Sequence, residues 1–183
     1  MIALKETHLL AELRDPATKV AAFDRLIKGY QEVLYHHIRR IVINHDDTDD
    51  VLQNTLIKAW QNLDKFRGDA NIKTWIYRIA TNEALNFLKK KKRQAFQEVE
   101  DLQNDLRHSL SSGRYVDGDE IQIRLQEAII ALPERQKLVF NLRYFDEMPY
   151  DEISSILGVT VGALKASYHH AVKKVEHHLK RYA

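Results

Sequence analysis

Aromatic and basic side chains are interleaved in the middle of the sequence, between Phe66 and Arg93. A short polar loop at 67–71 precedes a segment with helical spacing, and a run of five cations follows at 89–93. The aromatic and basic residues of the helical segment are Lys73, Trp75, Tyr77, Arg78 and Phe87. Aromatic rings stack on unpaired bases, and cations neutralise phosphates. The segment therefore indicates a surface for partly single-stranded nucleic acid.

A second pattern typical of DNA binding lies at 150–172, which reads YDEISSILGVTVGALKASYHHAV. Gly158 separates two helical patterns, and glycine readily adopts the positive φ that ends a helix in a tight turn. Val159 is expected to fill the turn, and Thr160 is placed to cap the second helix. The expected inner stripe of that helix is Leu164, Tyr168, Ala171 and Val175. The spacing predicts a helix-turn-helix, with an ordinary helical hairpin as the alternative.

The outward face of the second helix is then available to enter a major groove. Its residues are Val161, Lys165, Ala166, His169, His170 and Lys173. Lys165 is a candidate for a base-edge or phosphate contact, and Lys173 or Lys174 for a phosphate contact. Neutral histidines can still donate or accept one hydrogen bond in the groove.

The composition describes an ordinary globular chain: of 183 residues, 44% are hydrophobic and 30% are charged. The net charge is only +2, but the charges are segregated. Four aspartates lie within 46–50, whereas cations gather at 89–93 and 173–181. Such a distribution fits a protein with two kinds of partner.

Several classes of function are disfavoured by the sequence. Cysteine is absent, which excludes thiolate chemistry, and no nucleotide-binding glycine motif, zinc-hydrolase motif or nucleophile motif is present. No two histidines have the i, i+4 spacing of a helical metal site, and 46–50 lacks the pattern of a calcium loop. We therefore expect no enzymatic activity, no cofactor, no metal and no small-molecule substrate. No apolar run is long enough to span a membrane, so we expect a cytoplasmic protein.

Helical periodicity dominates the sequence, and no segment alternates at strand spacing. The expected stripe of a first helix is Phe23, Leu26, Ile27, Tyr30, Leu34 and Ile38, with a turn near Asn44–Asp46. Thr48 or Asp47 would cap the next helix, whose expected stripe is Leu52, Leu56, Ala59, Trp60 and Leu63. After the polar loop, the third stripe is Ile72, Trp75, Ile76, Ile79, Ala80, Ala84, Phe87 and Leu88.

The stripes also separate expected core residues from expected contact residues. Trp60, Trp75, Ile76 and Ile79 fall on them and are expected to be buried. Tyr77 lies off the stripe and is therefore the better candidate for contact with DNA.

The apolar pattern stops between 94 and 120, where the sequence is polar and rich in Ser and Gly. We therefore predict an all-α fold of two small helical domains, 1–93 and 121–183, joined by a flexible linker at 94–120. A segment of this linker, 96–106, can be locally helical. Within the second domain, the spacing predicts helices that carry Leu125, Ala128 and Leu132, and then Leu138, Leu142 and Phe145.

These segments resemble, in two blocks, the extracytoplasmic-function (ECF) sigma factors of bacterial RNA polymerase, the smallest members of the sigma-70 family. Residues 46–93 resemble the second conserved sigma region through DDTDDVLQNTLIKAWQNL and FRGDANIKTWIYRIATNEALNFL. Residues 125–179 resemble the fourth region through LPERQKLVFNLRYFDEMPYDEISSILGVTVGALKASYHHAVKK. The order and separation of the blocks agree with the family.

The resemblance implies a function for each block. The second region would bind the clamp of core RNA polymerase through Asp50, Gln53 and Asn54. It would read the unpaired non-template strand of the −10 promoter element. The residues implied in that contact are Arg67, Gly68, Asp69, Ala70, Asn71, Lys73, Tyr77, Arg78 and Asn82. The fourth region would read the paired −35 element through the outward face described above, and the polymerase flap would be its protein partner.

The resemblance also implies a cognate anti-sigma factor that covers the polymerase-binding surfaces, and association with the nucleoid in the holoenzyme. The sequence departs from the family at three places. Asn54 stands where many relatives have an acid, Trp75-Ile76 where larger relatives have two aromatics, and Ala166, Ser167 and His170 where arginines are common. Two other functions remain as alternatives: an autonomous helix-turn-helix transcriptional regulator, and a sequestering protein that binds a partner without touching DNA.

Overall fold

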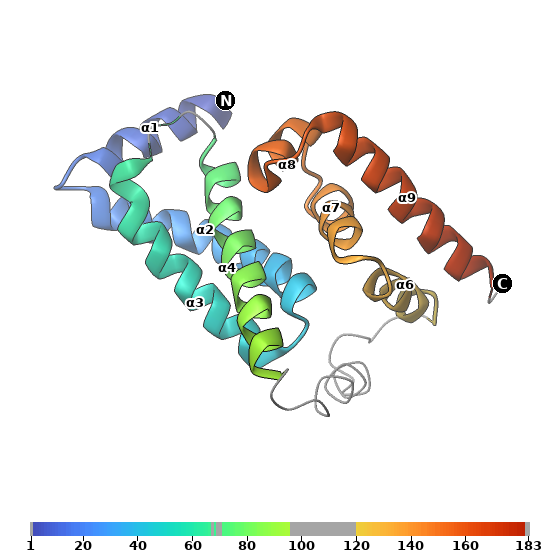
Figure 1. Ribbon diagram of the computed structural model, residues 1–183. Coiled ribbons are helices and arrows are strands. Elements are labelled where there is room, and N and C mark those ends of the chain that lie inside the picture. Colours follow the sequence, from blue (N-terminus) through green and yellow to red (C-terminus); the bar gives the residue numbers. More distant parts are fainter. Residues whose placement is uncertain (1, 67, 69–70, 96–119, 182–183) are drawn as a thin grey trace. The chain divides into compact units, whose positions relative to one another are not determined.

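The computed structural model describes residues 2–66, 68, 71–95 and 120–181, and every element in these ranges is helical (Figure 1). The chain divides into two compact units, 1–89 and 90–183. The all-α, two-domain prediction is confirmed. The expected linker lies almost wholly outside the described residues, as does the expected helical segment at 96–106, and the exact domain limits stay predictions.

The first unit contains α1 (Ile2–Arg14), α2 (Lys19–Val42), α3 (His45–Asn62), the short 3-10 helix η1 (Leu63–Lys65) and α4 (Ile72–Ala95). Its α1 was not expected from the sequence. One core cluster joins residues from α1, α2, η1 and α4, namely Leu13, Ala22, Leu26, Leu63 and Ile72. Leu9 and Leu10 of α1 pack against this cluster together with Phe66 and Trp75. The first helix therefore covers the segment that leads into α4.

The cap of α3 differs from the prediction. Ile43, with φ of 72°, ends α2, and the Asn44 side chain accepts a hydrogen bond from the backbone N–H of Asp47 at 3.1 Å. Asn44 is thus the N-cap, and neither Thr48 nor Asp47 serves as one. Thr48 is instead buried, and its hydroxyl donates to the carbonyl of Asn44. Asp46 and Asp47 lie in the first turn, where the helix dipole favours negative charge.

The buried face of α3 is rotated relative to the expected stripe. The buried residues are Thr48, Val51, Thr55 and Ala59, whereas Leu52 and Leu56 are only half-buried. Thr55 can be buried because its hydroxyl donates to the carbonyl of Val51 at 2.8 Å. Trp60 is 39% exposed, so the prediction that it is a core residue is wrong. Its ring packs edge-on against Phe23, with the centroids 5.0 Å apart.

The buried face of α4 is wider than its apolar residues suggest. Ile76 is fully buried as predicted, and Trp75 and Ile79 are half-buried. Tyr77 is only 2% exposed, so the prediction that it faces outward is wrong. Two buried threonines, Thr74 and Thr81, extend the face to include it. Buried His37 of α2 completes this part of the core: its Nε2 lies 2.9 Å from the Thr81 hydroxyl, and its ring centroid lies 4.9 Å from that of Tyr77.

The second unit contains α6 (Glu120–Ile130), α7 (Glu134–Tyr144), α8 (Tyr150–Leu157) and α9 (Val161–Lys180). Helix α9 packs against the other three (Figure 1). The core cluster consists of Ala128, Ile129, Leu132, Phe140, Ala171 and Val175. At the other end of α9, Leu164 is buried, as are Ile153 and Ile156 of α8. The long final helix is therefore held along its length by the rest of the unit.

Candidate nucleic-acid interface

The turn between α8 and α9 has the geometry that the sequence predicts. Gly158 ends α8 in the left-handed region, with φ of 66° and ψ of 31°, and its N–H donates to the carbonyl of Ser154 at 2.9 Å. A Cβ at this position would meet no atom within 4 Å, so glycine is favoured here by its backbone angles rather than by space. The Thr160 hydroxyl then accepts from the N–H of Ala163 at 3.4 Å and caps α9. Half-buried Val159 lies between the two.

The two faces of α9 are separated as expected. Leu164, Ala171 and Val175 are buried, and Tyr168 is half-buried. Five of the six residues on the predicted contact face are exposed, namely Lys165, Ala166, His169, His170 and Lys173. The sixth, Val161, is half-buried in the first turn. The structure thus brings the predicted −35 residues onto one accessible surface.

An aromatic side chain with two cations beside it lies next to this surface. The Arg143 guanidinium lies 5.1 Å, and the Lys165 Nζ 5.9 Å, from the centre of the Tyr150 ring. Arg143 also donates to the carbonyl of Met148 at 2.9 Å, which fixes it against the loop between α7 and α8. The Tyr150 ring contacts that of Tyr168, whose pKa is raised by its burial and then by Tyr150. Sequence reasoning missed Arg143 and Tyr150 because they meet only in three dimensions.

On the first unit, Arg78 and Asn82 are exposed one turn apart on α4, as the predicted −10 contact requires. Lys73 is half-buried, and its Nζ lies 5.8 Å from the centre of the Tyr77 ring. The Asn71 side chain accepts from the N–H of Thr74 at 2.9 Å, so it caps the start of α4. The −10 residues of the loop are only partly visible: Gly68, with φ of 85°, is described, whereas Arg67, Asp69 and Ala70 lie outside the described residues.

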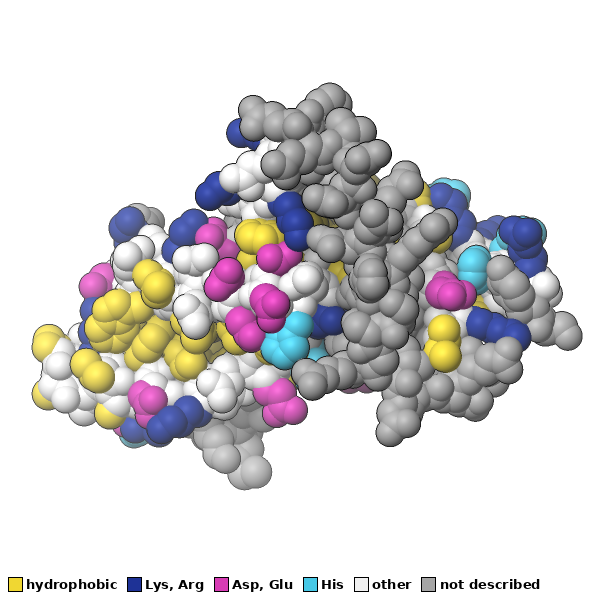
Figure 2. Space-filling view, turned by 90° about the horizontal axis from the view of Figure 1, so that it is seen from below, with side chains coloured by type: hydrophobic (Ala, Val, Ile, Leu, Met, Phe, Trp, Pro, Cys, Tyr) yellow, Lys and Arg dark blue, Asp and Glu magenta, His cyan; other side chains and the backbone are white. Residues whose placement is uncertain are grey.

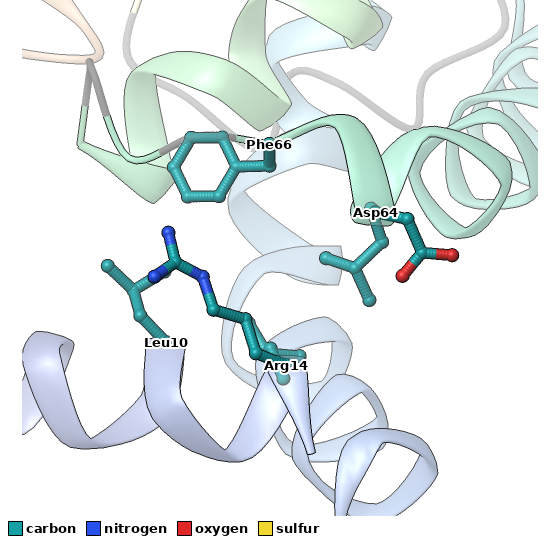
Figure 3. Close-up of a pocket in the computed structure, with 6 residues that line it drawn as sticks. Leu10, Arg14, Asp64 and Phe66 are labelled. Carbon is teal, nitrogen blue, oxygen red and sulfur yellow. The ribbon is translucent and has the colours of Figure 1, made fainter. Parts of the chain in front are cut away.

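Helix α1 approaches this loop from one side. A cavity of about 460 Å³ is lined by Leu10, Leu13, Arg14, Leu63, Asp64 and Phe66. The Arg14 side chain extends from α1 toward Phe66 (Figure 3). A Cβ at Gly68 would lie 3.7 Å from its Nη2. Asp64 is paired with Lys19, Nζ to Oδ1, at 2.6 Å. The cavity was not predicted, because α1, which forms one of its walls, was not predicted.

The predicted polymerase-binding residues Asp50, Gln53 and Asn54 are all exposed on α3. Ile57, which is 54% exposed, shares their face because it follows Gln53 and Asn54 by four and three residues. Trp60 is exposed at the edge of this face. The space-filling view in Figure 2 shows hydrophobic side chains gathered in one area at its left, with acidic side chains next to them. Ile57 and Trp60 were missed as contact candidates because apolar residues were assigned to the core.

Two further features are absent from the described residues. No helix there is both long enough and apolar enough to cross a membrane. In the same ranges, no three His, Cys, Asp or Glu side chains are grouped so that they could hold a metal ion.

A helix-turn-helix with an exposed basic face, in a chain whose other helical unit carries exposed cations of its own, is typical of a DNA-binding protein. Sigma-70 region 2 matches residues 26–94, and sigma-70 region 4 matches residues 122–175. The chain therefore belongs to the sigma-70 family, and it is an RNA polymerase sigma factor of the ECF group, as the sequence predicted. A sigma factor is a non-enzymatic subunit of the polymerase.

Named relatives are similar in sequence to this chain over most of its length. The RNA polymerase sigma-H factor of Pseudomonas aeruginosa is 31% identical over 163 residues, which cover 85% of this chain and 84% of that protein. The ECF RNA polymerase sigma factor SigW of Bacillus subtilis is 29% identical, covering 81% and 83% respectively. Among solved structures, the sigma factor RpoE of Bartonella quintana, in complex with the anti-sigma factor NepR, has a TM-score of 0.68. At 21% identity, over 86% of this chain and 96% of that one, this similarity shows the fold alone.

Proposed function

We propose that this sigma factor binds core RNA polymerase, directs it to promoters with separate −35 and −10 elements, and promotes opening of the DNA for transcription initiation. The observation that carries the proposal is the presence, in one chain, of two different exposed surfaces with polar and basic side chains. One is the outer face of α9, suited to paired DNA, and the other is the Arg78 and Asn82 edge of α4. A regulator that binds only duplex DNA has no need of the second surface.

At the −35 element, α9 lies in the major groove. Lys165 can reach a guanine edge or a phosphate, and Ala166 leaves room for the methyl group of a thymine. His169 and His170 each offer a ring nitrogen for one hydrogen bond to a base edge. Arg143 beside Tyr150 supports this surface from α7, where its charge favours the nearby DNA backbone.

At the −10 element, a base that has left the duplex can be recognised on its hydrogen-bonding edge, which is hidden while the base is paired. Arg78 and Asn82 supply a phosphate contact and an amide suited to base-edge hydrogen bonds, in addition to the proposed contacts of the loop at 67–71. Tyr77 is not part of this contact, because it is packed against His37 in the core. Its proposed role is to hold α4 in place.

The proposed contact with the polymerase clamp uses Asp50, Gln53 and Asn54, to which the exposed Ile57 adds an apolar centre. An apolar residue surrounded by polar groups is the usual composition of a protein interface. The second unit would contact the polymerase flap.

We further propose a cognate anti-sigma factor. Two proteins of similar fold were solved as complexes: the sigma factor RpoE with the anti-sigma factor NepR, and CnrH with the cytosolic domain of CnrY. An anti-sigma factor that covered Ile57 and its neighbours would block assembly with the polymerase. The corresponding location is the cytoplasm, with association to the nucleoid in the holoenzyme.

Run-off transcription with purified core enzyme across fragments of the source genome tests this function. Discrete start sites should appear only when the chain is added, with a shared pair of upstream elements. Ile57→Ser should weaken association with core about tenfold, since an interface anchor contributes about 1–2 kcal/mol. Val33→Ser, an exposed apolar residue of α2 (42% exposed) that is not among the proposed contacts, is the matched control. A chain that neither bound core nor initiated on any template would contradict the proposal.

A further inference from the structure

We propose that the C-terminal turns of α9 form a phosphate-binding surface that binds the DNA backbone beside the −35 element, independently of the DNA sequence. We call it the C-terminal basic face, and it consists of Lys173, His177, Lys180 and Arg181. The inference rests on the proposed function, because it needs α9 to lie on DNA.

The length of α9 allows such a contact. Its 20 residues extend over roughly 30 Å, whereas a major groove is about 12 Å wide. The first ten residues, which carry the proposed base-reading positions, occupy about half of this length. When such a helix enters the groove at its N-terminal end, its remaining turns extend beyond the bases, where they can reach the phosphates of the groove edge.

The C-terminal basic face continues the proposed reading face. Lys173 follows Ala166 by seven residues and His169 by four, and His177 and Lys180 extend the same spacing. All four residues of the basic face are exposed. On the opposite side, Ala171 and Val175 belong to the core cluster of the unit, so the helix cannot rotate away. The same docking that presents Ala166 and His169 to the groove thus presents Lys173 and Lys180 to the backbone.

The charges of this face are available for phosphates. None of its cations has an ion pair within the described part of the chain. Glu176 is the one acid among the residues of α9. A solvated helix surface would also leave the cations unpaired, so their availability alone does not distinguish the two cases. The distribution of charge along the helix does so.

Fixed positive charge is concentrated outside the reading positions. Lys165 is the only Lys or Arg between 161 and 172, whereas four are present between 173 and 181. Phosphate contacts supply most of the sequence-independent affinity of DNA-binding proteins. The region-4 match ends at residue 175, yet α9 continues to Lys180. This chain therefore places its main cationic contribution at and beyond the end of the matched region.

The salt dependence of binding tests the inference. The observed association constant of the holoenzyme for a promoter fragment would be measured against KCl concentration for wild type and for Lys173→Gln/Lys180→Gln/Arg181→Gln. Each lost phosphate contact should reduce the slope of log K against log salt by about 0.9. At fixed salt, the triple substitution should lower the affinity by the same factor on the native promoter and on a promoter whose −35 element has been replaced. The two factors should agree because phosphates carry no sequence information.

Two control variants define the result. Arg135→Gln removes an exposed cation from the first turn of α7. Because this residue does not belong to the basic face on α9, its loss should leave the slope unchanged. Lys165→Gln should reduce discrimination between the native and the replaced −35 element. An unchanged slope in the triple variant would overturn the inference, as would a loss of binding to core enzyme, which would indicate a protein partner for the basic face.

The same titration with the full chain alone on duplex DNA separates this inference from the proposed function. A wild-type chain that fails to associate with core contradicts the proposed function. If the slope of log K against log salt on duplex DNA is still smaller for the triple variant than for wild type, the C-terminal basic face binds phosphates even so.

Discussion

Glu147, in the loop between α7 and α8, has φ of 52°, which places it in the left-handed region. This conformation costs a residue with a Cβ about 1 kcal/mol or more. Glu147→Gly removes the strain but adds backbone entropy to the unfolded state, so we expect a net gain of about 0.5 kcal/mol in the free energy of unfolding. Urea unfolding followed by circular dichroism measures the gain.

In the control for this prediction, the free energy of unfolding should fall instead of rise. Glu176→Gly makes the same change of side chain in the interior of α9, where glycine should cost about 1 kcal/mol. Equal effects at the two positions would show that the backbone angles of Glu147 are not the cause.

Lys137 links the stability of the second unit to pH. Burial of its ammonium, partly offset by Glu134, lowers its pKa below the ordinary value. Its Nζ lies 3.3 Å from the carbonyl oxygen of Ile130. The folded protein therefore binds this proton less tightly than the unfolded chain does, and between the lowered and the ordinary pKa folding releases a proton. The penalty is fully present below the lowered pKa and is relieved as the pH rises through it.

Lys137→Met abolishes this pH-dependent penalty. We expect the free energy of unfolding of the variant to exceed that of wild type most at pH values below the lowered pKa of Lys137. This excess should decline as the pH rises from the lowered pKa to the ordinary lysine pKa. Urea unfolding of both proteins at a series of pH values measures the difference. Lys174→Met, at an exposed position of α9, should show no such trend. A constant difference for Lys137→Met would contradict the assigned cause.

At the scale of the elements, apolar periodicity predicted α2, α4 and α9, because each buries apolar residues at helical spacing. It misplaced the buried face of α3, where Thr48 and Thr55 are buried with their hydroxyls bonded to the backbone. Periodicity counts threonine as polar, so the same cause hid the burial of Tyr77 between Thr74 and Thr81. Helix α1 was missed because its core contacts involve Leu9, Leu10 and Leu13, a pattern too short to recognise without the partner elements.

The sequence predicted the candidate site better than the core. The reading face of α9 follows from Gly158 and Thr160, which fix where the helix starts and therefore which residues point outward. Contacts between distant segments could not be predicted in this way. Arg143 beside Tyr150, and Arg14 beside Phe66, depend on how the helices pack.

The contribution of α1 can be measured directly. Leu13 is 4% exposed and shares a core cluster with Leu26, Leu63 and Ile72. Leu13→Ala should lower the free energy of unfolding of the first unit by about 2–4 kcal/mol, through lost burial and the cavity left behind. Both tryptophans, Trp60 and Trp75, belong to this unit, so their fluorescence during urea unfolding reports on it.

The matched control is Leu10→Ala, a half-buried residue of the same helix that lines the open cavity. Its loss should be markedly smaller. Equal losses, or none from Leu13→Ala, would mean that α1 is not part of the cooperative core of the unit.

At the scale of the whole molecule, the distribution of charge matches the two proposed partners, core RNA polymerase and DNA. The aspartates at 46–50 lie at the start of α3, next to the proposed polymerase contact, and the cations lie on α4 and α9, which face DNA in the proposal. A net charge of +2 is compatible with DNA binding because the two surfaces are on different elements. Two small modules carried on one polymerase can each bind weakly and still give a stable promoter complex.

This arrangement predicts that contacts on the two units contribute independently. Arg78→Gln on α4 and Lys165→Gln on α9 should each weaken the holoenzyme–promoter complex by about 1–3 kcal/mol. Because the residues share no partner and lie on different units, the loss in the double variant should equal the sum of the two losses within about 0.5 kcal/mol. Competition binding on one promoter fragment at fixed salt supplies the four affinities of the cycle.

A second cycle on one surface provides the contrast. Lys165 and His169 are one turn apart on α9, so they contact neighbouring groups of the DNA and their losses should not add. If instead the cycle between the two units showed a double variant no weaker than the weaker single variant, loss of either contact would release the other. The two units would then act as one rigid reader, and the independence of the −10 and −35 contacts would be refuted.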